Sequence, residues 1–222
     1  MTNDRMAGLA LIAGSAGVIV TLSLHPSGRE LFEPGKFESA ARTLIAVHSL
    51  ALCSLPVWFL GACGLSRRVG HPENPDDQLG FAGLVLYGFA MAAMMVAVVM
   101  DGLVTPGLAR HIVETTGTVD QATLGQSWRI ALRYNGILDE AFVRVFITAS
   151  SAAIGLWSVA IVRSRVLARG LGVYGCVLGA VTVIALISGQ MDRYPHIFGM
   201  VVVGQAIWFV AAGGLLCRER KA

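Results

Sequence analysis

The chain has 222 residues, of which 55% are hydrophobic and only 14% are charged. Soluble proteins carry roughly 25% charged residues, so this composition excludes an ordinary soluble domain. The formal net charge is only +3. We assign the basic residues to membrane topology, and therefore expect no nucleic-acid partner.

Six segments are long and apolar enough to cross a lipid bilayer as helices, which takes about 20 residues each. They cover residues 6–24, 43–65, 80–100, 141–162, 170–189 and 197–217. The first segment exceeds the roughly 7–15 apolar residues of a signal peptide, so we expect it to be retained. The stretches between the segments are too short for a soluble domain. The sequence predicts an all-α membrane protein, a bundle of six transmembrane helices that forms a single domain over residues 1–222.

The distribution of lysine and arginine predicts the orientation of this bundle. Dense basic clusters occur in the short segments 66–68, 163–169 and 217–221, which all lie at the same end of the predicted helices. Basic residues at the opposite end are diluted among acids in longer loops. Because short cytoplasmic loops are enriched in lysine and arginine, both termini are predicted to be cytoplasmic. The expected location is the bacterial cytoplasmic (inner) membrane.

The longest outer loop covers residues 101–134. It is expected to begin with a helix stop, because Gly102 and Pro106 directly follow the third segment. Further along, Leu124 and Trp128 recur on one face at helical spacing, beside arginines. This pattern predicts a short interfacial helix that lies on the membrane before the fourth segment.

Polar and ionisable residues gather at the outer ends of the hydrophobic segments. Such groups are costly at membrane depth, so they mark the place where a ligand or a reaction is expected. The candidate residues of a pocket open to the non-cytoplasmic side are His25, His48, Asp101, Asn135, Asp139, Glu140, Arg144 and His196.

The fourth segment carries a polar stripe of Glu140, Arg144, Thr148 and Ser151 at steps of three or four residues. Glu140 precedes Arg144 by four residues, the favourable order for an ion pair. Lipid exposure of Arg144 would be costly, so the stripe is expected to face the bundle interior. Two interpretations remain open. The ion pair fixes the position of the helix, or Arg144 binds a small anion or a lipid-like ligand.

Three histidines lie at similar depth near the end of the third segment. His25, His48 and His196, together with Asp101, offer ligands suited to zinc or another transition metal. A pair formed by His48 and His196 would instead suit haem. No two of these residues share a local motif such as HExxH, so their convergence depends on helix packing. The sequence favours neither cofactor over none.

Small residues recur at helical spacing in the first and fifth segments, at Gly14, Gly17, Gly172 and Gly175. They predict close helix packing within the bilayer and offer faces for a homo-oligomer.

Motifs for nucleotide binding, serine hydrolysis and zinc proteolysis are absent from the sequence. This favours a structural, accessory or binding role over an enzyme. The alternatives are an intramembrane enzyme that uses the outer cluster with a metal or haem, and a small transporter. Tyr87 and Gln205 lie at middle depth, where interhelical hydrogen bonds are expected. The inner halves of the segments hold few other polar residues, which argues against a path through the membrane.

Overall fold

The computed structural model describes residues 3–26, 28–33, 35–70, 77–114, 121–190 and 195–218 of the chain. These residues are helical apart from short connections. Six of the described helices are long and apolar enough to cross a membrane, as the sequence predicted. The fold therefore fits a multi-pass membrane protein.

In chain order the helices are α1 (Asn3–Leu24), the 3-10 helix η1 (Gly28–Phe32), α2 (Phe37–Val69), α3 (Asp77–Val99), the π-helical turn η2 (Met100–Val104), α4 (Thr105–Glu114), α5 (Gln121–Ser164), α6 (Arg169–Ile187) and α8 (Pro195–Cys217).

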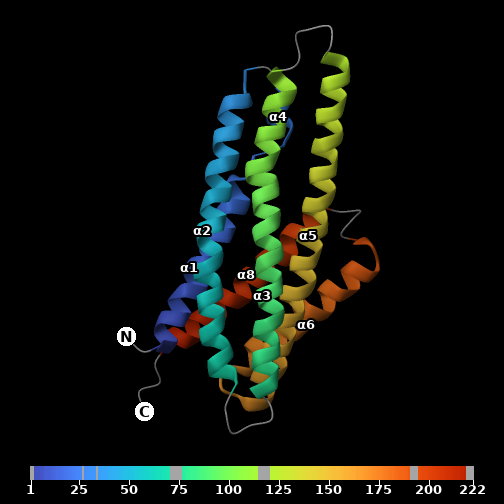
Figure 1. Ribbon diagram of the computed structural model, residues 1–222. Helices are drawn as coiled ribbons and strands as arrows, with labels where there is room; N and C mark the ends of the chain where they lie inside the picture. Colours follow the sequence, from blue (N-terminus) through green and yellow to red (C-terminus); the bar gives the residue numbers. More distant parts are fainter. Residues whose placement is uncertain are drawn as a thin grey trace.

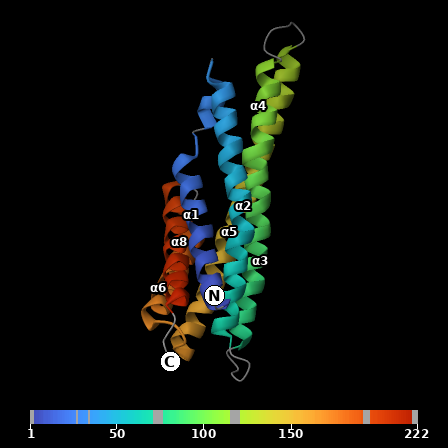
Figure 2. The same ribbon diagram turned by 90° about the vertical axis from the view of Figure 1, so that its left-hand side faces the viewer.

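The spanning helices pack in the order in which they occur in the chain. α1 contacts α2, α2 contacts α3, α3 contacts α5, α5 contacts α6 and α6 contacts α8, while α8 returns to α1 and closes the ring. α1 begins and α8 ends at the same end of the bundle (Figures 1 and 2), where Cys217 Sγ lies 3.6 Å from the carbonyl oxygen of Arg5. His25, which follows α1, therefore lies toward the opposite end.

The middle of the bundle is filled by aromatic side chains. Trp58, Tyr87, Trp157, Trp208 and Phe209 are each at most 1% exposed. The Trp58 and Phe209 rings meet edge to face with their centroids 5.0 Å apart. Since lipid is as apolar as these side chains, their close packing is what holds the helices together.

Helix α5 extends well beyond the thickness of a bilayer. α5 has 44 residues and is therefore roughly 66 Å long at about 1.5 Å per residue, against a hydrocarbon core of about 30 Å. Its first half runs beside α4, and the two project together from the bundle (Figure 1). His111 of α4 stacks on Trp128 of α5 with ring centroids 4.6 Å apart.

The separate interfacial helix predicted within residues 101–134 is not confirmed. Trp128 lies in α5 itself, where it packs against α4. The expected helix stop is wrong as well, because α3 passes through η2 directly into α4. Pro106 lies in the first turn of α4, directly after the π-helical turn, and the helix accommodates it without a break.

The glycine faces lie at helix contacts within the chain. A side chain at Gly14 would collide with Trp58 of α2, and one at Gly175 would collide with Ser158 of α5 and Trp208 of α8. Close approach of helices is therefore what these glycines permit here. A homo-oligomer through the same faces stays a prediction.

The two polar residues at middle depth behave differently. Gln205 of α8 donates from Nε2 to Ser151 Oγ (2.9 Å) and accepts from Ser150 Oγ (3.0 Å), which confirms its interhelical bonding. Tyr87 is fully buried, but its hydroxyl has no hydrogen-bond partner among the described residues. The expectation for Tyr87 is therefore wrong, since its ring serves the aromatic core instead.

Candidate functional site

His25 follows the last residue of α1 and precedes a proline, so the chain turns at this point. Its ring Nδ1 lies 2.9 Å from the carbonyl oxygen of Pro26, which can only accept, so Nδ1 carries the hydrogen. Its Nε2 faces the other way and lies 2.9 Å from Asp101 Oδ2. The backbone contact thereby fixes the orientation of the ring.

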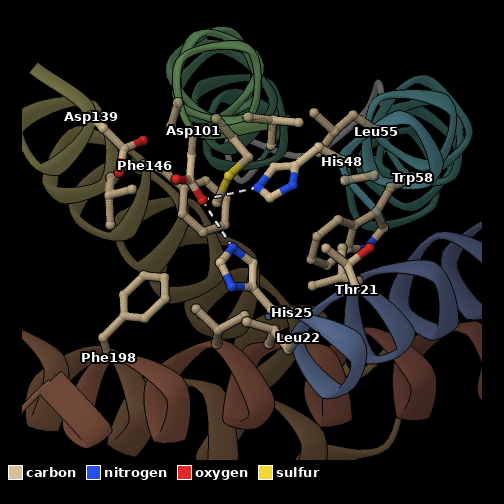
Figure 3. Close-up of a pocket in the computed structure, with 17 residues that line it drawn as sticks. Thr21, Leu22, His25, His48, Leu55, Trp58, Asp101, Asp139, Phe146 and Phe198 are labelled. Carbon is tan, nitrogen blue, oxygen red and sulfur yellow. Dashed lines mark hydrogen bonds and ion pairs between the residues drawn. The ribbon is translucent and has the colours of Figure 1, made fainter. Parts of the chain in front are cut away.

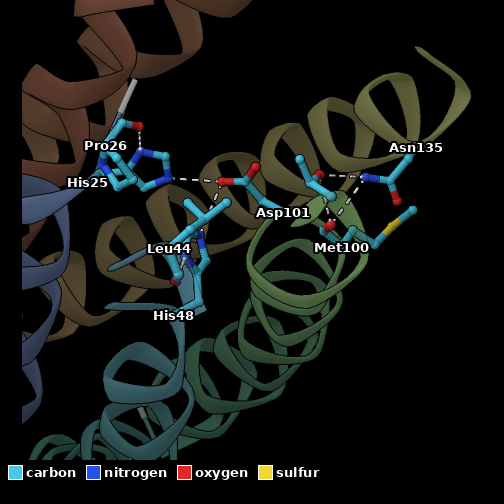
Figure 4. Close-up of polar contacts among 8 residues, drawn as sticks. His25, Pro26, Leu44, His48, Met100, Asp101 and Asn135 are labelled. Atoms are coloured by element: carbon cyan, nitrogen blue, oxygen red, sulfur yellow. Dashed lines mark hydrogen bonds and ion pairs between the residues drawn. The ribbon is translucent and has the colours of Figure 1, made fainter. Parts of the chain in front are cut away.

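His48 approaches the same carboxylate from α2. Its Nδ1 donates to the carbonyl oxygen of Leu44, one turn earlier, at 2.8 Å. Its Nε2 lies 3.1 Å from Asp101 Oδ2, and the residue is only 4% exposed. Figure 4 shows both imidazoles directed at the same carboxylate, His25 from the turn after α1 and His48 from α2.

Asp101 comes from the π-helical turn η2. In this turn the N–H of Thr105 bonds to the carbonyl of Met100, five residues earlier. Asn135 of α5 donates from Nδ2 to the same carbonyl (3.1 Å) and to Thr105 Oγ1 (3.0 Å) (Figure 4). A single π-helical turn within an α-helix is often found at a functional site, because it redirects one side chain. Asn135 thus holds the turn that presents Asp101.

The residue after Asp101 has to be small. A side-chain carbon added at Gly102 would collide with Cβ and Cγ of His48. Only glycine allows η2 to approach α2 closely enough for the carboxylate to reach the imidazole.

Two neutral imidazoles would not fit the contacts of this cluster. Both imidazoles use Nδ1–H for a backbone carbonyl, so in the neutral form each Nε2 carries a lone pair. Both lone pairs would then face one carboxylate oxygen, which is repulsive. The contacts are favourable when each ring carries a second proton or when a cation lies between the three atoms.

The three facing atoms have the spacing of a metal-ligand set. One ligand atom each from His25, His48 and Asp101 lie within 4.8 Å of one another, and both Nε2 atoms contact Asp101 Oδ2, at 2.9 and 3.1 Å. A tetrahedral zinc ion with ligand bonds of about 2.0–2.1 Å separates its ligand atoms by roughly 3.3 Å. Metal-bound histidines commonly donate their other nitrogen to a backbone carbonyl, as both do here. Small side-chain movements would therefore complete a metal site.

His25 lies outside the membrane-spanning helices, and its pKa is raised above the ordinary value of 6.5. The hydrogen bond to Asp101 is the main cause, supported by the charge of that carboxylate, while burial opposes the shift. In the absence of a cation, His25 therefore holds a proton more strongly than a free histidine does.

A cavity of about 180 Å³ adjoins the cluster and is lined by side chains of the surrounding helices (Figure 3). His25, His48, Asp101 and Asp139 lie at its polar end. The remaining walls are almost entirely apolar and come from α1, α2, α3, α5 and α8: Val18, Thr21, Leu22, Ala51, Leu55, Trp58, Met94, Ala97, Val98, Val143, Phe146, Phe198 and Val202.

The other candidate residues lie elsewhere. The Glu140–Arg144 ion pair exists as predicted, at 2.6 Å, but its side chains are 59% and 49% exposed and do not line the cavity. The expected inward orientation of the stripe is therefore wrong at its outer end, although Ser151 is buried. His196 is the second residue of α8, and its side chain is outside the part that the structure describes.

Three features of the site were not predicted from the sequence. They are the π-helical turn, the close contact of Gly102 with His48 and the apolar cavity. The sequence signal for the turn and the glycine contact was the pair Asp101-Gly102 after an apolar segment. This pair is equally typical of a helix end. The cavity walls carry no local signal, because they are ordinary apolar residues of five helices.

Comparisons with protein-family models, with curated proteins and with solved structures find no match to this chain. The fold and the site alone thus define the class, a helical multi-pass membrane protein with a histidine–aspartate cluster near one end.

Proposed function

We propose that this chain is a membrane metalloprotein that binds one divalent transition-metal ion, zinc being the best match. The ligands are Nε2 of His25, Nε2 of His48 and Oδ2 of Asp101. The observation that carries the proposal is the orientation of the two imidazoles, whose Nδ1–H groups are held by backbone carbonyls while both Nε2 atoms converge on one carboxylate oxygen.

Two neutral histidines and one carboxylate match the donors that zinc takes in its catalytic sites. Such sites have three protein ligands and leave a further position open to water or substrate. Here the cavity lies next to the three ligands. This favours a reactive site over a purely structural one, and therefore the metal-dependent alternative over the accessory role expected from the sequence.

Haem and a small anion, the alternatives to a metal ion, fit this cavity less well. The cavity of about 180 Å³ is below the ~300–1,000 Å³ of pockets for drug-sized ligands, which argues against a haem beside His48. Arg144 does not line this cavity, so the structure offers no support for an anion held there. From the positive-inside pattern, we further propose that the site faces the non-cytoplasmic side of a bacterial inner membrane.

The test is metal analysis of the purified full-length protein after zinc loading and removal of free metal. About one zinc per chain is expected, together with a raised unfolding temperature, because binding to the native state stabilises it. His48→Ala and Asp101→Asn are each expected to weaken zinc binding by more than about 100-fold, beyond the effect of losing an outer-shell partner.

His111→Ala is the matched control, since His111 lies on α4 and stacks on Trp128 away from the cluster. It should retain full zinc content. A parent protein that binds no zinc, or a His48→Ala variant that binds zinc as the parent does, would refute the proposed site.

A further inference from the structure

The cavity has a polar end and an apolar interior, and a ligand that fills it would have to match both. Its polar end holds the three proposed metal ligands and Asp139, whereas its depth is lined by aliphatic and aromatic side chains. Trp58, which is only 1% exposed, lies among the deep walls. A molecule that fills this space therefore has a polar group at the cluster and an apolar chain in the bundle.

Asp139 is the one carboxylate at the cavity that the proposed metal set does not use. It comes from α5 and lies beside Asp101 at the polar end (Figure 3). It is half-buried and lines the same cavity as Asp101, His48 and His25. Among the described residues it makes no hydrogen bond or ion pair. A carboxylate placed next to an open metal position is the usual proton acceptor for an attacking water.

We propose that the site hydrolyses an acyl ester or amide whose apolar acyl chain occupies the cavity, with Asp139 as general base. This inference rests on the proposed metal site. The small cavity volume suits one narrow chain better than a ring system. The apolar walls exclude water along the chain and leave the acyl carbonyl at the polar end.

The reaction consumes one water and needs no oxidant or reductant. The ion held by His25, His48 and Asp101 would polarise the carbonyl and stabilise the charge on its oxygen. Asp139 takes a proton from the water, whose oxygen bonds to the carbonyl carbon. The bond from that carbon to the leaving oxygen or nitrogen then breaks, and the proton passes from Asp139 to the leaving group. The products are a carboxylic acid and an alcohol or amine.

The experiment uses the zinc-loaded full chain in phosphatidylcholine vesicles, with 4-nitrophenyl octanoate and 4-nitrophenyl acetate as probes. Release of nitrophenol and zinc content are measured on the same samples. The octanoate ester is expected to be cleaved faster than the acetate ester. Asp139→Asn is expected to lower the rate by about 10²–10⁴-fold, the usual contribution of a general base, while zinc content stays unchanged.

Matched neighbours supply the controls. Glu140→Gln removes the adjacent carboxylate, which is exposed and outside the cavity, and should retain the parent rate. Val143→Phe fills the cavity from α5 and should lower octanoate cleavage more than acetate cleavage. Val145→Phe, at a position that is 50% exposed and not part of the wall, should change neither rate.

The outcomes separate this inference from the metal site. Zinc-loaded parent protein that cleaves neither ester faster than His48→Ala overturns the hydrolase while the metal site stands. Equal rates for Asp139→Asn and the parent overturn the general base. Equal rates for the two esters, unaffected by Val143→Phe, overturn the acyl-chain assignment. Absence of bound zinc in the parent defeats the metal site itself.

Discussion

At the scale of single residues, the site depends on which partner each of the two imidazole nitrogens contacts. His25 and His48 give one nitrogen to a neighbouring carbonyl and direct the other at Asp101. The backbone contacts select the tautomer, and the carboxylate joins the rings. His48 is buried, whereas the His25 side chain is 37% exposed. Among the proposed ligands, His25 is therefore the one at which protons from solvent would compete most directly with a metal.

This competition predicts a pH dependence. The proposed metal would require the neutral Nε2 of His25, but the pKa of His25 is raised above 6.5 without a metal. Zinc affinity should therefore fall as the pH drops from about 8 to about 6, with release of protons on binding. Calorimetric titration across this range measures both effects. His111→Ala should show the same pH profile, and a zinc affinity independent of pH would contradict the role of His25.

The same pKa shift makes the metal-free protein more stable at lower pH, opposite to its effect on zinc binding. Because the folded pKa of His25 is raised, protonation favours the folded state. The resulting stabilisation is fully present below the unfolded pKa and is lost as the pH rises through the folded pKa. Mild acid should therefore raise the stability of the metal-free protein and lower that of the zinc-loaded protein.

At the scale of the elements, the π-helical turn η2 decides the geometry. It widens the helix where α3 passes into α4 and sets Asp101 between α1 and α2. Asn135 of α5 satisfies the Met100 carbonyl in this turn. Gly102 then lies directly against His48. The turn after α1, together with α2, η2 and α5, thus contributes to a site whose central carboxylate comes from one irregular turn.

Two glycines of this region provide a matched pair. Gly102→Ala would place its methyl group against His48, so we expect overpacking to cost about 1–3 kcal/mol of folding stability. Zinc affinity should fall by about 10–100-fold, as for the loss of an outer-shell partner. Gly107→Ala has open space in α4 and should be neutral or slightly stabilising. Denaturation and zinc titration compare the two, and equal behaviour would contradict the close contact.

At the scale of the whole molecule, the ring of six helices separates two kinds of chemistry. Aromatic rings fill the middle, while the described ionisable side chains that line the cavity stay near the end away from the termini. The projecting pair of α4 and α5 extends further at that same end (Figure 2). A site at one end suits a reaction with access from one side better than it suits transport across the bilayer.

The sidedness is open to direct measurement. With the four native cysteines replaced by serine, Glu114→Cys is expected to react with a membrane-impermeant maleimide in intact cells. Arg169→Cys, at the start of α6, should react only after permeabilisation, because arginine-rich loops stay cytoplasmic. The reverse pattern would place both termini, and the basic clusters, on the outer side.

The sequence by itself determined the class, the six spans and the end at which polar groups gather. Segment length and apolar composition fix these properties, because a bilayer imposes them locally on each helix. It also indicated His25, His48 and Asp101 as metal candidates, and the Glu140–Arg144 pair, which depends only on spacing within one helix.

Only the tertiary structure decided which of the polar residues meet. Asp101 lies 76 residues from His25, so their contact depends on how α1, α2 and η2 pack. The same packing leaves Arg144 facing outward and encloses a cavity from apolar residues of five helices. A spacing pattern shows which residues share one helix face, but the rotation of that helix against its neighbours is set by contacts along its whole length.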